Sequence, residues 1–165
     1  MIRKLFKNRK PNAKIHALVG KYNIPKHYLS INRKMVANAM LVGLFFAMIP
    51  MPMQMLAVIL TLSIIKFNVP LAVSLVWISN PLTMPFIFYG EYTLGNLFLA
   101  QEDIPMQMTI AWFQNNLDSI FMPLYLGALI TALVFGFGSR YLVNHLWRQS
   151  VKKEQRTKRV KTKRK

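Results

Sequence analysis

The chain alternates between long apolar segments and short polar interruptions, and two of the interruptions fall inside the apolar segments. Residues 35–65 form a run of 31 residues without a charge, bounded by Lys34 and Lys66. As one continuous helix this run would be about 46 Å long, whereas the hydrocarbon core of a bilayer is roughly 30 Å thick. The run is therefore too long for one upright span and too short for two complete spans with a turn.

Two prolines stand in the middle of this run. Pro50 is its central residue and Pro52 follows closely, and a proline removes a backbone donor and clashes with the preceding helical turn. The pattern predicts two half-helices, 35–48 and 53–66, each about 21 Å long, that meet at a break. A single long helix, kinked at the prolines and tilted in the membrane, is the alternative.

The second apolar segment, 69–100, repeats this design. Asn68 precedes it, and Asn80 lies about ten residues further on, followed directly by a proline. Because Asn is a favoured N-cap and Pro a favoured first helical residue, "NPLT" predicts a new helix start inside the apolar segment. The predicted structural breaks of the two segments are Pro50, Pro52, Pro70, Pro81 and Pro85.

The third part of the chain begins with a mixed, acidic stretch. Residues 101–118 predict an external loop or a short interfacial helix, with Trp112 at headgroup depth. Residues 119–139 then form an uncharged run of 21 residues that ends at Arg140, which is the pattern of a complete transmembrane helix. The chain as a whole is predicted to be an all-α integral membrane protein, with broken or re-entrant helices beside transmembrane helices.

The charges sit almost entirely in the two tails. Residues 1–34 hold ten Lys or Arg and no acid, and residues 140–165 hold eleven with Glu154 as the only acid. The net charge of +17 therefore belongs to two tails on either side of a nearly neutral membrane domain, 35–139. Basic segments next to apolar spans stay on the cytoplasmic side. Both tails are therefore predicted to be cytoplasmic, in a multi-pass protein of the bacterial inner membrane.

An even number of crossings leaves two topologies open. In the first, 35–65 is a re-entrant hairpin that returns to the cytoplasmic side at Lys66, while 69–90 and 119–139 span the membrane. In the second, 35–65 is the kinked span, and 69–100 is a re-entrant piece that enters from outside. The first is preferred because it keeps Lys66 on the cytoplasmic side.

Small residues recur at four-residue spacing in two of the segments, where they would let a neighbouring helix approach closely. We predict that the two faces pack on each other, within one chain or across a homo-oligomer; coincidence in helices rich in Ala and Gly is the alternative. The residues are Ala39, Gly43 and Ala47 in the first segment, and Ala128, Ala132 and Gly136 in the third.

The basic tails indicate a polyanionic partner. Clusters of Lys and Arg beside a membrane attract anionic headgroups by about 1 kcal/mol for each basic residue near the surface. Nucleic acid is the other polyanion that such tails bind. No recognisable base-reading motif accompanies the charge, so the bilayer is the predicted partner and nucleic acid is not expected.

The broken segments predict a binding site. A backbone break at membrane depth is tolerated where its freed N–H and C=O groups are buried in protein or face water, and half-helix starts favour an anionic group. The candidate ligand-binding residues are Met53, Gln54, Asn80 and Thr83, and the predicted ligand is a small anionic or lipidic molecule. The alternative is that Gln54 and Asn80 only cap the broken ends and hold helices together.

Metal and catalytic chemistry have little support in the sequence. An extended stretch would point Met51, Met53 and Met55 the same way, and thioethers suit Cu(I), but Met is also a flexible apolar filler and neither Cys nor His lies nearby. Residues 35–139 contain no His, no Cys and no pair of acids plausibly inside the membrane. We therefore expect no metal site, no cofactor and no enzymatic activity.

Three stretches together resemble a known family: "PMPMQMLA" at 50–57, "KFNVPLAVSLVWISNPLTMP" at 66–85 and "YTLGNLFL" at 92–99. The family is a bacterial membrane-protein family classed as a domain of unknown function, whose relatives are sometimes fused to glycosyltransferases. The resemblance extends from about residue 20 to 145. It implies an integral inner-membrane protein and supplies no activity. Where many relatives have Gly near position 53, this chain has Met53. The ordered set that carries the resemblance is Pro50, Pro52, Gln54, Asn68, Pro70, Asn80, Pro81, Thr83 and Gly95.

Two functions remain open on this basis. In the first, the chain binds or translocates a small anionic or lipidic molecule at a site between the two breaks. In the second, it is a membrane scaffold that transports nothing, whose breaks are packing devices and whose basic tails recruit a partner or anionic lipid.

Overall fold

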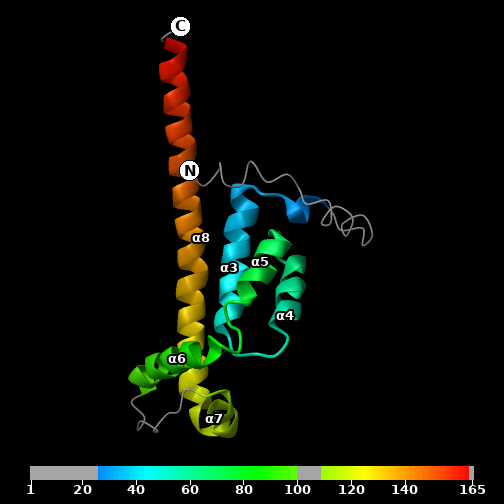
Figure 1. Cartoon of the computed structure of the whole chain (residues 1–165), viewed down its shortest axis with the longest axis vertical. Helices are drawn as coiled ribbons and strands as arrows, with labels where there is room; N and C mark the ends of the chain where they lie inside the picture. The colour runs from blue at the N-terminus through cyan, green and yellow to red at the C-terminus, as the bar shows by residue number, and fades with distance from the viewer. Residues whose placement is uncertain (1–25, 100–108, 164–165) are drawn as a thin grey trace.

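The structure, a computed structural model, describes residues 26–99 and 109–163. Within these ranges every regular element is helical (Figure 1). The elements are the 3₁₀ helix η1 (Lys26–Leu29), α3 (Arg33–Met48), α4 (Gln54–Leu60), the 3₁₀ helix η2 (Thr61–Ser63), α5 (Val69–Val76), α6 (Met84–Leu99), α7 (Ile110–Asn115) and α8 (Leu117–Lys163).

Helix α8 is the long axis of the molecule, and the other described helices gather around its first half (Figure 1). Its 47 residues correspond to about 70 Å. Within the described residues it is the one helix long and apolar enough to cross a membrane, over Asp118–Thr157. The run 119–139 and the basic tail, treated as separate segments at the sequence level, thus form one continuous helix as far as Lys163.

The first apolar segment folds back on itself as a hairpin. Helix α3 begins after Asn32, whose side chain accepts a hydrogen bond from the N–H of Met35, and it ends at Met48, just before the prolines. Helix α4 then leads the chain back toward the start of α3, where Asn38 Nδ2 donates to the carbonyl of Lys66 over 2.9 Å. The second half-helix is shorter than predicted, because it tightens into η2 and residues 64–68 form no regular helix.

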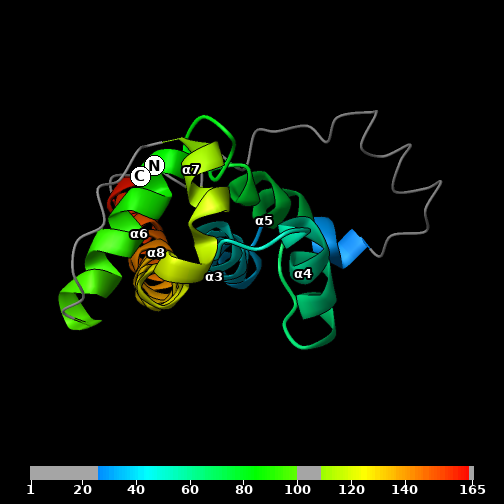
Figure 2. The ribbon, with the colours of Figure 1, turned by 90° about the horizontal axis from the view of Figure 1, so that it is seen from below.

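The second apolar segment is also divided. Asn68 caps α5 by accepting from the N–H of Leu71, and α5 ends at Val76. After a turn, α6 runs steeply across α8 instead of alongside it (Figures 1 and 2). The break predicted at Asn80 therefore separates two helices of different direction within the stretch 69–90.

The predicted external stretch 101–118 is described in part, because residues 100–108 lie outside the described ranges. Helix α7 occupies its second half, capped by the side chain of Thr109, and α8 follows almost directly. Trp112, expected at headgroup depth, packs on the buried cluster of Tyr92, Ile120 and Leu124 between α6 and α8.

The predicted small-residue faces pack in a different way from the one expected within a single chain. Ala39 belongs to a buried cluster with Ala72 and Val76 of α5, and a side chain at Gly43 would meet α5 as well. Only Ala47 joins the α8 face, in a cluster with Ala132. The reason is that α3 packs against two helices at once, so its small residues are shared between them. On α8, Ala128 is buried and Gly136 lies against Leu41 and Phe45.

The closest helix crossing involves two glycines that the sequence did not single out for packing. A Cβ at Gly95 would lie 1.8 Å from the carbonyl oxygen of Pro123, and one at Gly127 would lie 1.7 Å from that of Glu91. No side chain fits at either position. The crossing of α6 and α8 therefore depends on direct backbone contact, as in small-residue helix pairs of membrane proteins.

Candidate functional site

The first break is closed by Gln54, the first residue of α4. Its Nε2 donates to the carbonyl of Ile49 over 2.8 Å, and its Oε1 accepts from the hydroxyl of Ser79 over 3.2 Å. Gln54 and Ser79 are both buried. The Gln54 amide therefore serves one backbone group freed by the prolines and ties the first break to the end of α5.

Tyr125 of α8 serves a second freed group of the same break. Its hydroxyl donates to the carbonyl of Pro50 over 2.6 Å. Sequence reasoning missed this residue, because 75 positions separate it from Pro50 and nothing in its own segment marks it. A single tyrosine in an otherwise apolar run was the only available signal.

Met53 has a conformational role at this break. It lies in the left-handed region with φ 58° and is 77% exposed, so its side chain lines no buried site. Since that region costs a residue with a Cβ about 1–2 kcal/mol, glycine is the favoured residue there. A glycine at this position would therefore serve the left-handed backbone conformation.

The second break is self-contained. Asn80 Oδ1 accepts from the N–H groups of Leu82 and Thr83 over 2.9 and 3.2 Å, and Asn80 Nδ2 donates to the carbonyl of Trp77. The Thr83 hydroxyl in turn donates to the carbonyl of Ile78 and accepts from the N–H of Asn80. Pro81 lies within this turn and Pro85 in the first turn of α6.

The structure thus brings the two breaks together, but through protein groups. Gln54 meets Ser79, the neighbour of Asn80, while Asn80 and Thr83 are occupied by their own turn. The polar side chains predicted to hold a ligand are engaged with the backbone around them. These contacts cap the broken ends and hold the helices together.

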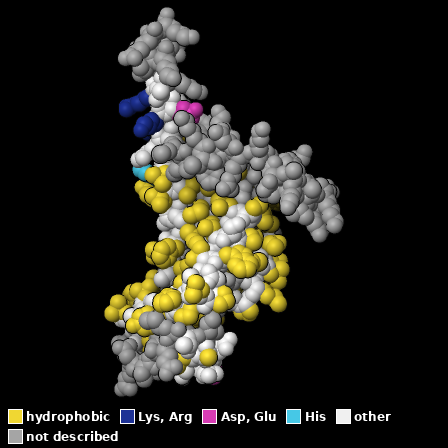
Figure 3. Space-filling view, in the orientation of Figure 1, with side chains coloured by type: hydrophobic (Ala, Val, Ile, Leu, Met, Phe, Trp, Pro, Cys, Tyr) yellow, Lys and Arg dark blue, Asp and Glu magenta, His cyan; other side chains and the backbone are white. Residues whose placement is uncertain are grey.

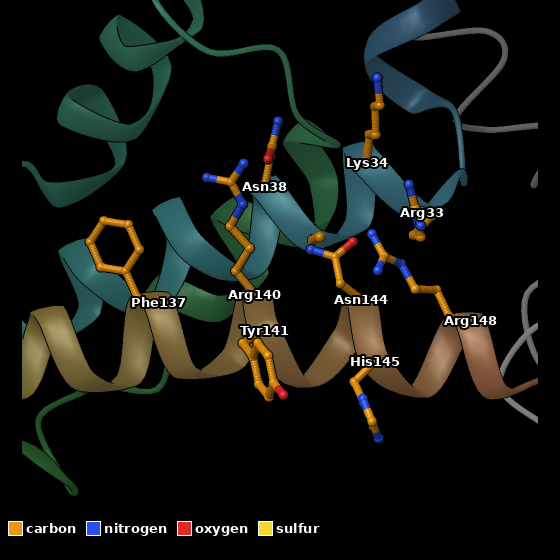
Figure 4. Close-up of a pocket in the computed structure, with 10 residues that line it drawn as sticks. Arg33, Lys34, Asn38, Phe137, Arg140, Tyr141, Asn144, His145 and Arg148 are labelled. Carbon is orange, nitrogen blue, oxygen red and sulfur yellow. The ribbon is translucent and has the colours of Figure 1, made fainter.

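A cavity of 830 Å³ lies elsewhere, between the start of α3 and the middle of α8. Figure 4 shows Arg33 and Arg148 extending toward each other from the two helices, with Arg140 and Asn144 pointing from α8 toward α3. Tyr141 and His145 point away from α3 and stack on each other with ring centroids 6.0 Å apart. The lining residues are Arg33, Lys34, Ala37, Asn38, Phe137, Arg140, Tyr141, Asn144, His145 and Arg148. We call this cavity the basic pocket.

The electrostatics of the basic pocket favour an anion. Four of its lining residues are Arg or Lys and none is Asp or Glu. Arg33 and Lys34 are also the first two residues of α3, where the positive end of the helix dipole disfavours a cation by about 0.3–1 kcal/mol. A bound anion would relieve both the mutual repulsion and the unfavourable dipole contact.

The basic pocket borders the apolar surface of the molecule. In Figure 3 the exposed apolar side chains cover the middle, while the coloured Lys, Arg and His side chains lie above it. The exposed apolar residues of α8 that precede the pocket or lie at its edge are Leu129, Leu133, Val134, Phe135, Phe137, Tyr141 and Leu142. A molecule with a charged head and an apolar tail would find both environments side by side.

In the sequence, the four basic residues of the pocket, Arg33, Lys34, Arg140 and Arg148, were counted only as tail charge. The available signal was the spacing of Arg140, Asn144 and Arg148, four residues apart on one helix face. That spacing becomes informative only once residues 140–148 are known to be helical and to lie beside Arg33. Among the described residues, no group of three His, Cys, Asp or Glu side chains could hold a metal ion.

Comparison with known proteins gives one match. A family described as "Uncharacterized protein conserved in bacteria (DUF2062)" matches residues 17–156. Neither a curated protein nor a solved structure matches the chain. The matched range includes both breaks, the α6–α8 crossing and the basic pocket.

Proposed function

The chain belongs to this uncharacterised bacterial family, and from that premise we propose that it is a multi-pass inner-membrane protein that binds the phosphate-bearing headgroup of an anionic lipid in the basic pocket. The observation that carries the proposal is that Arg33, Arg140 and Arg148 all line one cavity with no acid among its lining residues.

The membrane arrangement is supported by the positions of the charged ends. Arg33 and Lys34 at the start of α3 face the basic half of α8, so the described basic residues of both ends of the chain lie on one side of the molecule. In this proposal α8 crosses once. The chain before α8 must then make one net crossing. It enters the membrane through α3, returns to the cytoplasmic side at Lys66 and enters again through α5. Hydrogen bonds of Asn38 to the carbonyl of Lys66 and of Asn68 N–H to the carbonyl of Met35 keep the return at the level of the α3 start.

This arrangement makes 35–65 the re-entrant hairpin and directs the acidic stretch, from α6 to the start of α8, to the external side. The exposed apolar side chains on α4 and α8 support it, because a water-exposed monomer rarely carries so large a continuous apolar surface. The α4 side of this surface includes Leu56, Ile59, Leu60 and Ile64.

The chemistry of the pocket fits a phosphate group. Guanidinium groups bind phosphate oxygens through paired N–H donors, and Asn144 adds a neutral donor between Arg140 and Arg148. The neighbouring apolar surface suits the acyl chains, which favours a lipid over a free phosphate. We propose a binding role rather than an enzymatic one, because the pocket presents groups that hold an anion and places no carboxylate beside it.

The test compares two triple variants of the full-length protein in nanodiscs. Arg33→Gln/Arg140→Gln/Arg148→Gln removes three charges from the pocket. Lys152→Gln/Lys153→Gln/Arg156→Gln removes three charges from α8 alone, beyond the pocket. Binding of a fluorescent phosphatidylglycerol is measured in a phosphatidylcholine background, with glycerol phosphate and inorganic phosphate as soluble competitors.

We expect the pocket variant to bind the lipid at least about tenfold more weakly, since losing several charge-assisted hydrogen bonds exceeds 1.4 kcal/mol. The distal variant should retain most of the affinity. Competition by inorganic phosphate at equal concentration would assign the site to a free anion instead of a lipid. Equal losses in the two variants would overturn the proposal, because they would mean that only total charge matters.

A second candidate function, membrane scaffolding, is favoured by one observation. Beyond the pocket α8 continues as a basic helix well past the start of α3 (Figure 1). Its outer turns lie more than a Debye length, about 8 Å, from the pocket, so headgroup attraction there is weak. A scaffold would lose partner recruitment in the distal variant and keep it in the pocket variant, which is the reverse of the lipid-binding expectation.

A further inference from the structure

Glu91 is a buried acid that the lipid-binding proposal does not use. It lies on α6 at the crossing with α8 and is 2% exposed. Its own carbonyl oxygen touches the backbone at Gly127, so the crossing has no room for an intervening layer of side chains or water. Burying an ionisable side chain at a helix crossing costs free energy, so such a residue indicates a functional role.

The hydrogen bonds around Glu91 define its chemical form. Oε1 lies 3.3 Å from the hydroxyl oxygen of Thr131 on α8, and Oε2 has no hydrogen-bond partner. The same hydroxyl oxygen lies 3.0 Å from the carbonyl oxygens of Gly127 and Ala128. A hydroxyl carries one proton, and carbonyl oxygens can only accept.

The two shorter contacts favour donation of the Thr131 proton to its own helix, which turns a lone pair of Thr131 toward Glu91. An ionised carboxylate would keep at most the long 3.3 Å bond from Thr131, at the expense of those contacts, and its Oε2 would stay unpaired. A protonated carboxyl solves the problem, because its O–H donates to Thr131. The pair then forms a chain of two donations, from Glu91 to Thr131 and from Thr131 to the α8 backbone.

The described surroundings offer no positive charge for an ionised Glu91. The nearest cation along α8 is Arg140, nine residues from Thr131 and thus about 13 Å along the helix. Helix α7 carries no titratable side chain, and on α3 Arg33 and Lys34 lie at the end away from α6. The other titratable groups on α6 and on the adjoining part of α8 are Tyr89, Tyr92, Asp118 and Tyr125, none of which can be positive.

We propose that Glu91 and Thr131 form a proton-binding site at the α6–α8 crossing, which is closed when Glu91 is protonated and opens when the proton leaves. Loss of the proton places an unpaired carboxylate between two helices in backbone contact, and an uncompensated buried charge is strongly destabilising. Separation of α6 from α8, which admits water to the carboxylate, relieves that penalty. This site is independent of the basic pocket.

The first test is infrared spectroscopy of the full-length protein in nanodiscs. A protonated carboxyl has a C=O stretch distinct from that of a carboxylate. At neutral pH this band should be present in the wild type, absent in Glu91→Gln and unchanged in the control Asp118→Asn, which removes an exposed acid of α8. A band unaffected by Glu91→Gln, or no such band in the wild type, would overturn the proposal.

The second test measures the opening. Because the chain has no cysteine, spin labels can be attached at Leu97→Cys on α6 and Leu133→Cys on α8, both exposed. The distance between the labels should increase as alkaline pH removes the band in the wild type. It should not change in Glu91→Gln, whose amide keeps a neutral donor toward Thr131.

A wild-type band that titrates while the distance stays constant would contradict the proposed opening. If the variant does not fold, the wild-type titration decides the matter alone.

Discussion

The two proline breaks look alike in sequence and are stabilised in different ways. At the first, the Ile49 carbonyl receives a local donor from Gln54, but Gln54 is also bound to Ser79 of the second segment, and the Pro50 carbonyl receives its donor from Tyr125 of α8. At the second, Asn80 and Thr83 satisfy the turn that contains them.

The difference shows what a break in an apolar segment requires. Freed backbone groups must find partners, because an unpaired buried polar group costs about 1–3 kcal/mol. A turn with Asn and Thr three residues apart carries its partners with it and can form early. The "PMPM" break contains no such side chain before Gln54, which satisfies Ile49 alone, so the Pro50 carbonyl depends on α8 being in place.

The largest effect is expected at the first break. Gln54→Leu leaves the Ile49 carbonyl without its donor and breaks the link to Ser79, whose hydroxyl keeps the Val76 carbonyl as acceptor, and should lower the free energy of unfolding by about 2–3 kcal/mol. The measurement is unfolding by dodecyl sulfate in mixed micelles, followed by circular dichroism. The control Met55→Leu, on the same helix and partly exposed, should change it by less than about 0.5 kcal/mol. Equal effects of the two substitutions would mean that the Gln54 amide does not stabilise the break.

Tyr125→Phe removes only the hydroxyl that donates to Pro50 and should cost about 1–1.5 kcal/mol in the same assay. Tyr141→Phe, an exposed tyrosine on the same helix, serves as the control and should be neutral. Combining Tyr125→Phe with Gln54→Leu should deviate from additivity by at least about 0.5 kcal/mol, because both residues serve one break. Strict additivity would indicate that the two carbonyls are satisfied independently.

Asn80→Ala removes a local cap and should lower the free energy of unfolding by about 1 kcal/mol. Asn80→Asp should lose much less stability, since a carboxylate accepts the same N–H bonds. Combined with Tyr125→Phe, the costs should add within about 0.5 kcal/mol. A strong coupling between these two positions would remove the distinction between a self-contained break and a dependent one.

The smallest effect is expected at Met53. Met53→Gly relieves a left-handed backbone cost of about 1–2 kcal/mol but loses about 0.5–1 kcal/mol through added chain entropy. The free energy of unfolding should therefore rise by less than about 1 kcal/mol. A decrease would show that the exposed Met53 side chain makes a stabilising contact in the membrane or in an assembly.

Much of the local structure could be predicted from the residues. The end of α3 at Met48, before the prolines, and the helix start at Asn68 follow from backbone chemistry that acts over a few residues. The position of the break at Asn80 was also predicted, but the direction of the helix that follows it was not. A span was predicted for 69–90, because hydropathy reports length and not the angle at a turn.

The candidate site was less predictable. Gln54 and Asn80 were correctly recognised as polar groups at breaks, but the sequence left open whether they hold a ligand or the backbone. The basic pocket was not foreseen, because Arg33 and Arg148 are 115 positions apart and each looks like ordinary tail charge. The same holds for Glu91, whose partner Thr131 lies forty positions further along the chain.

By itself, then, the sequence determined where the helices break, which ends are basic and which stretch is long enough to cross a bilayer, because proline, asparagine and apolar runs act locally. Tertiary structure alone decided which groups satisfy the first break, which arginines share a pocket and which hydroxyl meets the buried acid. Those pairings depend on how α3, α6 and α8 cross, and the backbone contacts at Gly95 and Gly127 that set the α6–α8 crossing exist only after the helices have packed.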